Sequence, residues 1–156
     1  MSTAVQTEEK MIVIKLLGKE YVVPVLEVKS IERWQQPTRV PGVEAYIKGV
    51  INLRGVVTPI IDLQSRLELP SSEVSESTRI IIVAIGELEA GFIVDEANDV
   101  ISACQHEIEQ PTETAEKAAD EWVTGIIKRG NRILNLLDSK AVLDRSIHSE
   151  PAQSLV

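Results

Sequence analysis

Two apolar runs separated by a polar break open the patterned part of the chain. Residues 11–17 are almost entirely apolar, a Gly-Lys-Glu sequence interrupts them, and residues 21–26 continue the apolar pattern. Such runs on either side of a glycine-containing break are typical of a β-hairpin. The segment 35–42, which carries two prolines, is predicted to be a loop. Strands are therefore expected from Met11 onward.

The sharpest pattern lies in residues 47–63, where two β-branched runs flank a polar break at residues 52–55. The break contains an asparagine and a glycine, which tolerate the positive φ angles of a tight turn. The stretch is therefore predicted to form a hairpin with Arg54 at its tip. Asp62 follows the second run, with leucines one and five residues later, and this pattern predicts a helix N-cap and a short helix.

The second half of the chain repeats this order of elements. Residues 70–78 have little apolar content and several turn formers, which indicates a linker or surface loop. Apolar runs at residues 80–85 and 90–94 flank a Gly-Glu break and predict another hairpin. Residues 109–121 are acidic and rich in alanine, with too few apolar positions for a stable amphipathic helix, so a loop is expected there.

Two fixed offsets relate the halves of the chain. At an offset of 76, two glycines, two aspartates and several aliphatic residues coincide, among them Gly49 with Gly125, Val50 with Ile126, Asp62 with Asp138 and Leu67 with Leu143. At an offset of 68, the upstream matches are Ile12 with Ile80, Val13 with Ile81, Ile14 with Ile82 and Gly18 with Gly86. Aligned glycines and aspartates are harder to obtain by chance than aligned aliphatic residues. The chain is therefore interpreted as two copies of one unit.

Each copy is predicted to contain about five short strands, which a closed sheet accommodates without exposed edges. The predicted fold class is all-β, with two pseudo-symmetric five-stranded barrels and short helices. The first barrel is placed at about residues 10–70 and the second at about residues 78–145, and exchange of strands between them is left open. Residues 1–9 and 146–156 are expected to be flexible tails. A groove between the barrels would be a natural site for a partner segment.

Charge and composition favour protein partners. The chain has 16 lysine and arginine residues against 24 acidic residues, and the net charge of −8 disfavours binding to nucleic acid or anionic lipid. Its one cysteine cannot form an internal disulfide, and residues 1–10 lack the apolar core of a signal peptide, so a cytoplasmic location is expected. No apolar run approaches the roughly 20 residues that a transmembrane helix needs.

Few residues offer catalytic or metal-binding chemistry. Cys104 and His106 would share one face of a strand, but two ligands are too few for a closed zinc site, and neither a metal nor a cofactor is expected. A small Cys-dependent hydrolase or redox enzyme, which requires a depressed thiol pKa, is kept as an alternative of a different class. Three acidic residues that follow a strand are interpreted as a solvated turn rather than a catalytic carboxylate pair: Asp95, Glu96 and Asp99.

The most specific motifs of the chain are Tyr-Ile-Lys-Gly-Val-Ile-Asn-Leu-Arg-Gly at residues 46–55, Pro-Ile-Ile-Asp-Leu at residues 59–63 and Val-Asp-Glu-Ala-Asn-Asp-Val at residues 94–100. Together they resemble the CheW family of chemotaxis coupling proteins, and the resemblance runs from about residue 11 to residue 143. It implies two SH3-like barrels and a scaffold without catalytic activity. It also implies that the scaffold joins the cytoplasmic tips of methyl-accepting chemoreceptors to the regulatory domain of the histidine kinase CheA, in arrays at the inner face of the membrane.

The resemblance also implies which residues bind the partners. The kinase contact maps onto the turn of the first motif, at Asn52, Leu53 and Arg54. The receptor contact maps onto positions in both halves, namely Val25, Val28, Gly49 and Val100.

The chain also departs from the family pattern at several positions. Val22 replaces a common glycine, Pro24 is unusual, and Ser30 stands where some members have an acidic residue. Near Glu109 and Thr114 the chain lacks the basic and aromatic residues with which some relatives make a second kinase contact. An adaptor for another receptor and kinase pair, such as one for twitching or development, is the nearer alternative to a chemotaxis role.

Overall fold

The computed structural model describes residues 8–110 and 122–143, so most of the expected tails and of the expected loop at residues 109–121 lie outside the described residues. Glu8 and Glu9 are an exception, because they belong to the first strand and not to a tail. Within the described ranges the chain forms strands, two short α-helices and two 3₁₀ helices: β1 (Glu8–Leu16), β2 (Lys19–Pro24), η1 (Val25–Glu27), β3 (Val28–Arg33), β4 (Ile47–Leu53), β5 (Val56–Asp62), α1 (Leu63–Arg66), β6 (Arg79–Ile85), β7 (Leu88–Val94), β8 (Glu96–Cys104), η2 (Gln105–Glu107), β9 (Val123–Arg129), β10 (Arg132–Leu137) and α3 (Ser139–Leu143).

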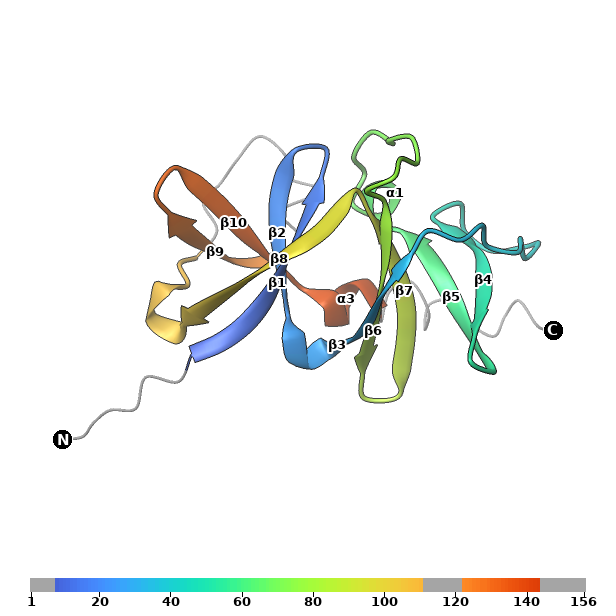
Figure 1. The fold of residues 1–156 in the computed structure, drawn as a ribbon, viewed down its shortest axis with the longest axis horizontal. Coiled ribbons are helices and arrows are strands. Elements are labelled where there is room, and N and C mark those ends of the chain that lie inside the picture. The colour runs from blue at the N-terminus through green and yellow to red at the C-terminus, as the bar shows by residue number, and fades with distance from the viewer. Residues whose placement is uncertain (1–7, 111–121, 144–156) are drawn as a thin grey trace.

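The strands form two five-stranded sheets that lie side by side, as Figure 1 shows. Sheet A has the order β8-β1-β2-β10-β9, and sheet B has the order β3-β6-β7-β5-β4. The all-β prediction is therefore confirmed. Each sheet takes strands from both halves of the chain, so the sheets do not follow the expected division at residues 10–70 and 78–145, and the exchange of strands that the sequence left open is present.

The two sheets are related by the repeat. Strand β1 corresponds to β6, β2 to β7, and so on up to β5 and β10. When every strand is exchanged for its counterpart, the order of sheet A becomes the order of sheet B. Both sheets contain one parallel pair, β2 with β10 and β5 with β7, which joins the two halves of the chain. Four antiparallel hairpins join strands that are consecutive in the chain, namely β1 with β2, β4 with β5, β6 with β7 and β9 with β10. The pseudo-symmetry predicted from the sequence is present in the topology.

The registers of the hairpins correct one of the two offsets. In the last hairpins Leu53 pairs with Val56 and Arg129 pairs with Arg132, in agreement with an offset of 76. In the first hairpins, however, Leu16 pairs with Lys19 and Ile85 pairs with Leu88, which corresponds to an offset of 69 and not 68. Gly18 and Gly86 misled the alignment because they occupy different positions of their turns. A shift of one residue exchanges the two faces of a strand.

Three hydrophobic clusters divide the interior. One cluster lies inside each sheet's own curve, around Met11 and Val22 in sheet A and around Ile60 and Ile82 in sheet B. The third and largest cluster lies between the sheets, and we call it the junction core. Its buried residues include aliphatic and aromatic side chains from both sheets and both helices: Ile12, Ile14, Tyr21, Val23, Leu63, Ile81, Val83, Phe92, Trp122, Leu137 and Leu143.

The junction core explains the continuous apolar runs of the sequence. Alternate residues of β1 face the interior of sheet A and the junction core, so both faces of this strand are buried and no polar alternation appears. The same holds for β6 in sheet B. The space between the barrels is consequently filled by side chains, and a partner can reach only its margins.

The predicted helix start at Asp62 is confirmed. Asp62 Oδ1 accepts a hydrogen bond from Ser65 N at 3.3 Å and caps α1. At the equivalent place in the second half, Asp138 Oδ1 accepts from Ala141 N at 3.0 Å at the start of α3. Neither helix is long enough to cross a bilayer, and the part of the chain that the structure describes contains no other α-helix.

Candidate functional site

The turn between β4 and β5 contains two residues, Arg54 and Gly55, because the flanking strands extend to Leu53 and Val56. Arg54 has a φ of +52° and Gly55 a φ of +87°, as a hairpin turn with two left-handed central residues requires. Asn52, which the sequence placed within the turn, lies in β4 instead. Its Oδ1 accepts a hydrogen bond from Gly55 N at 2.9 Å and holds the turn in place.

Arg54 combines a strained backbone with an exposed side chain. The left-handed conformation costs roughly 1–2 kcal/mol for a residue with a Cβ, and asparagine or glycine adopts it more readily. The Arg54 side chain is 73% exposed, and its Nη2 lies 3.5 Å from Glu32 Oε2 on β3. An ion pair this exposed contributes at most about 1 kcal/mol. Local stability therefore does not explain why an arginine occupies this position.

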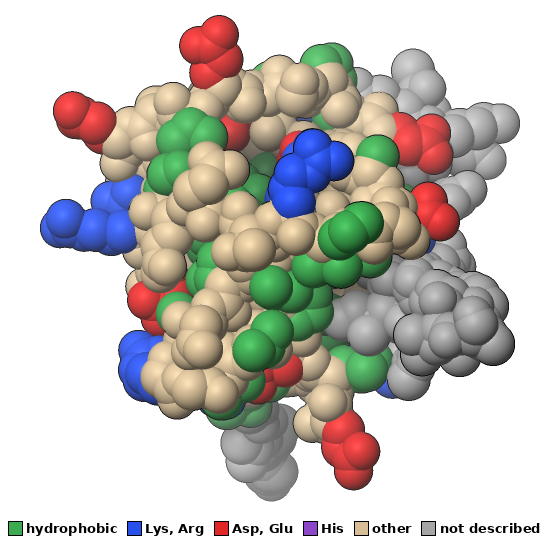
Figure 2. All heavy atoms as spheres, turned by 90° about the vertical axis from the view of Figure 1, so that its right-hand side faces the viewer, with side chains coloured by type: hydrophobic (Ala, Val, Ile, Leu, Met, Phe, Trp, Pro, Cys, Tyr) green, Lys and Arg blue, Asp and Glu red, His purple; other side chains and the backbone are tan. Residues whose placement is uncertain are grey.

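Aliphatic side chains surround the turn. Leu53 is half-buried against the cluster inside sheet B, whereas Val56 and Val57 are 47% and 63% exposed. Figure 2, which views the molecule from the side that carries β4 and β5 in Figure 1, shows hydrophobic side chains gathered on this face. An exposed arginine beside apolar side chains is the composition typical of the centre of a protein interface.

The three predicted receptor valines lie at the margins of the junction core. Val28 pairs with Val83 and Val100 pairs with Ile12, and both partners belong to the junction core. Because directly opposed residues of antiparallel strands point to the same face, Val28 and Val100 approach the junction core from different sheets. Val100 is 55% exposed, and Val25 and Val28 are half-buried against the core.

Gly49 differs from the valines because it is buried and has a φ of +140°. A Cβ at this position would lie 2.1 Å from Thr38 O, in the segment that pairs with Val50 and closes sheet B. Gly125 permits the equivalent approach in sheet A, where Glu109 pairs with Ile126. The structure thus gives Gly49 a local reason to be glycine, and a direct receptor contact by Gly49 stays a prediction.

Strand β3 connects the two predicted sites. Glu32, the ion-pair partner of Arg54, lies on β3, and Val28 begins the same strand. At about 3.3 Å per residue, the backbones of Val28 and Glu32 are about 13 Å apart. The predicted receptor residue Val28 therefore lies on the same strand as the ion-pair partner of Arg54, about four residues away from it.

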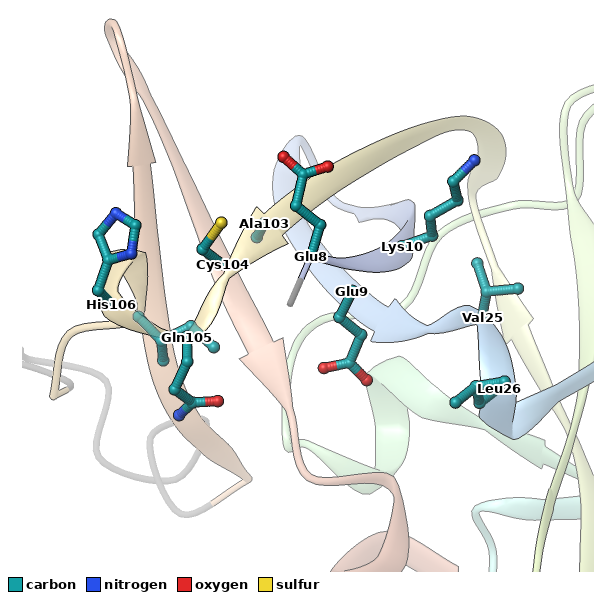
Figure 3. A pocket seen from close by; sticks show the side chains of 10 residues that line it. Glu8, Glu9, Lys10, Val25, Leu26, Ala103, Cys104, Gln105 and His106 are labelled. Atoms are coloured by element: carbon teal, nitrogen blue, oxygen red, sulfur yellow. The ribbon is translucent and has the colours of Figure 1, made fainter. Parts of the chain in front are cut away.

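A hollow of about 740 Å³ lies beside Val25. Figure 3 shows its walls, formed by the start of β1, by Val25 and Leu26 of η1, and by the end of β8 with η2. Cys104 and His106 also line it. Burial raises the pKa of the Cys104 thiol, and the carboxylates of Glu8 and Glu107 raise it further. A raised thiol pKa is the opposite of what the Cys-dependent enzyme required.

The three acidic residues that follow β7 are engaged in structural contacts. Asp95 Oδ2 accepts hydrogen bonds from Leu17 N at 2.8 Å and from Ser72 Oγ at 3.2 Å. Glu96 pairs with Lys15 at 3.8 Å and Asp99 with Arg132 at 3.5 Å. Among the described residues, no group of three or more potential ligands could hold a metal ion.

Two contacts of these regions escaped the sequence analysis. Glu32 could not be recognised as the partner of Arg54, because its approach depends on the closure of sheet B rather than on spacing. Arg66, whose guanidinium carbon lies 4.4 Å from the centre of the Tyr46 ring and 4.6 Å from that of Trp122, was also missed. The sequence did contain a sign of the aromatic pair around Arg66, since Tyr46 and Trp122 are related by the offset of 76.

Comparison with known proteins now defines the family. The model of the CheW-like domain matches residues 10–146. The chain belongs to the CheW family. A chemotaxis protein CheW from Bacillus subtilis is 55% identical over 156 residues, covering 100% of this chain and 97% of the relative. A CheW from Klebsiella aerogenes is 34% identical over 135 residues, covering 86% of this chain and 81% of the relative.

A solved CheW structure agrees with the fold. The crystal structure of the scaffolding protein TtCheW from Thermoanaerobacter tengcongensis matches with a TM-score of 0.77 and 30% identity, covering 84% of this chain and 89% of that chain. The two sheets are accordingly the two SH3-like barrels of a CheW fold. Of the two residues at which the sequence resemblance raised the question of a second kinase contact, Glu109 pairs with Lys128 at 3.5 Å, and Thr114 lies outside the described residues.

Proposed function

We propose that this CheW-family chain is a non-catalytic chemotaxis coupling adaptor that holds the cytoplasmic tip of a chemoreceptor and the regulatory domain of the kinase CheA at the same time. Its place of action is then the receptor array at the inner face of the membrane. The naming of the relatives as chemotaxis and scaffolding proteins supports this role. The single observation that carries the kinase contact is the strained, exposed Arg54 at a hairpin tip.

The backbone strain at Arg54 supports a role in kinase binding, because the stability of the folded protein alone would favour asparagine or glycine at this position. Residues held in unfavourable backbone conformations concentrate at functional sites. Arginine is among the residues that most often dominate the free energy of protein interfaces. The exposed Val56 and Val57 beside it supply apolar area that a partner can cover. The hairpin tip is therefore proposed to bind the kinase through Arg54, with Asn52 and Leu53 setting the shape of the turn.

The margin of the junction core supports the receptor contact. Chemoreceptor tips are helical, and a helix can place its apolar face against a row of exposed aliphatic side chains. Val100 of sheet A is exposed, and Val25 and Val28 are half-buried at the margin of the same packed core. The three valines are proposed to contact the receptor helix.

The test is a pair of binding isotherms for each of two variants, with the kinase regulatory domain and with a receptor tip fragment. Arg54→Glu is expected to weaken kinase binding by about 2 kcal/mol, roughly 30-fold, and to leave receptor binding unchanged. Val100→Met is expected to weaken receptor binding and leave kinase binding unchanged, since substitutions more than about 7–10 Å apart act independently.

Matched controls separate these effects from charge and size in general. Arg39→Glu changes another exposed arginine, and Val74→Met enlarges another exposed valine, so both should bind like the wild type. If Arg54→Glu abolished both interactions with the circular dichroism spectrum intact, the two sites would overlap and a two-partner scaffold would be excluded. Wild-type protein that bound neither partner would contradict the proposed function itself.

A further inference from the structure

The Arg66 guanidinium lies over two aromatic rings that belong to different barrels. It is the last residue of α1, which follows strand β5 of sheet B. Its guanidinium carbon lies 4.4 Å from the ring centre of Tyr46, which directly precedes β4 of sheet B. It also lies 4.6 Å from the ring centre of Trp122, which directly precedes β9 of sheet A. One side chain therefore contacts both barrels.

The two rings occupy equivalent positions in the repeat. Tyr46 O accepts a hydrogen bond from Asp62 N, and Trp122 O accepts one from Asp138 N, both at 2.7 Å. The two aspartates are the N-caps of α1 and α3. The rings thus approach Arg66 from corresponding points of two pseudo-symmetric units.

The arginine itself has no counterpart. The residue 76 positions after Arg66 is Val142, which is fully buried in the junction core. A single cation consequently serves both aromatic rings, and the repeat is broken at the place where its two copies meet.

The stack differs in kind from the other contact between the barrels. The junction core is apolar, and apolar burial resists separation but is not directional. A planar guanidinium attracts the face of an aromatic ring only over a limited range of distance and tilt. Trp122 is 4% exposed, so its ring cannot readily follow a displaced guanidinium. The contact therefore restricts how far one barrel can slide or rotate against the other.

We propose that Arg66 is a positioning residue that fixes the relative orientation of the two barrels and, through it, the geometry in which the adaptor presents its two partners. This inference rests on the proposed coupling function. Tyr46 stands at the start of β4, and the Arg54 turn stands at the end of the same strand. A shift at the stack is thus carried along β4 to the kinase turn, whereas Val100 moves with sheet A.

The first test measures orientation without either partner. Spin labels are attached at Val57→Cys in sheet B and Ile133→Cys in sheet A, both exposed, in a Cys104→Ser background. The distribution of distances between the labels is expected to broaden at least twofold in Arg66→Met, which keeps an unbranched, flexible stem and loses the planar cation. Arg39→Met is the matched control and should leave the distribution unchanged. An unchanged width in Arg66→Met would overturn the inference.

The second test measures coupling. Arg66→Met is expected to bind the kinase regulatory domain and the receptor fragment separately with Kd values within twofold of the wild type, while receptor control of kinase activity in the ternary assembly falls at least fivefold. Arg66→Lys, which keeps the charge without the plane, should lie between the two and serves as the test variant if Arg66→Met does not fold. Full receptor control in a variant with broadened distances would contradict the positioning role. Wild-type protein without affinity for the partners would instead contradict the proposed function and leave the distance result valid.

Discussion

Gly49 lies directly beneath the backbone of Thr38, so closely that a Cβ on Gly49 would be 2.1 Å from Thr38 O and 2.6 Å from its carbonyl carbon. The contact belongs to the pairing in which Thr38 N donates to Val50 O at 2.8 Å and Val50 N donates to Thr38 O at 2.9 Å. This pairing closes sheet B between β3 and β4. Any side chain at position 49 therefore acts on the closure of the barrel first.

Gly49→Ala is expected to lower the free energy of unfolding by about 3 kcal/mol or more, because the added carbon meets backbone atoms and the residue has a positive φ. Gly125→Ala is the matched control. Its Cβ would meet Ile108 Cγ2 at 2.5 Å, the end of a side chain that can move, so a loss of about 1 kcal/mol is expected. Urea denaturation of both variants measures the difference. Equal losses would show that the Thr38 segment yields as easily as a side chain.

Arg54→Asn is expected to stabilise the protein while weakening its binding to the kinase. Asparagine followed by glycine is the favoured pair for a turn with two left-handed residues, so relief of backbone strain should exceed the loss of the exposed contact with Glu32 by about 1 kcal/mol. Thermal unfolding and calorimetric titration measure the two effects. A variant less stable than the wild type would remove the argument from strain.

The two repeat offsets show which parts of the fold could be predicted from the sequence. The offset of 76 was correct because Gly49 and Gly125 each allow a close backbone approach and Asp62 and Asp138 each cap a helix. The offset of 68 was off by one because a glycine can occupy either position of a two-residue turn. Periodicity could not correct it, since both faces of these strands are buried.

Local sequence patterns could not predict which strands belong to which sheet. The parallel pairs join Leu134 with Glu20 and Ile60 with Gly91, and no turn or spacing rule specifies partners so distant in sequence. For the candidate site, the position and exposure of Arg54 followed from the hairpin pattern, but its strain did not. The turn was expected to be four residues long, with Asn52 in it, and only the strand register shows that Arg54 itself adopts the left-handed conformation.

Glu27→Gln is expected to stabilise the protein at neutral pH. Burial raises the pKa of Glu27, the nearby Glu9 and Asp138 carboxylates raise it further, and the Ser139 hydroxyl only partly opposes them. The hydroxyl is close to the carboxylate but badly oriented for bonding, since neither Glu27 Oε1 nor Ser139 Oγ forms a hydrogen bond of good geometry within the described part of the chain. The charged form of Glu27 is therefore disfavoured in the folded state.

The dependence on pH follows from the sign of this shift. An acid whose pKa is higher in the folded state binds more protons there, so the wild type loses stability as the pH rises from the unfolded pKa through the folded pKa. The variant should be the more stable at pH 7, and the difference should disappear below about pH 4, where Glu27 is protonated in both states. Thermal melts of both proteins across this range provide the measurement. A constant difference would assign the effect to packing.

Asp95→Ala is expected to loosen the segment 70–78. Asp95 Oδ2 holds Leu17 N and Ser72 Oγ, and Ser72 Oγ in turn accepts from the buried Gln64 Nε2 at 2.9 Å. Loss of two hydrogen bonds to a carboxylate should cost about 2 kcal/mol and increase proteolysis within the segment. Ser72→Ala, which keeps the bond to Leu17, should increase proteolysis with a smaller loss of stability. Equal cleavage of Asp95→Ala and the wild type would show that other contacts hold the segment.

The exchange of strands between the barrels also sets the order in which the protein can fold during its synthesis. Sheet B is complete once β7 ends at Val94, whereas sheet A needs β8, β9 and β10 and cannot close before Leu137. At about 5–20 residues per second, roughly 6–23 s pass between the synthesis of Pro24 and that of Leu137. Throughout that interval β2 lacks its neighbour β10, and β1 lacks its neighbour β8 until Cys104 has been made. The first hairpin to leave the ribosome is therefore the one that depends most on protection from aggregation.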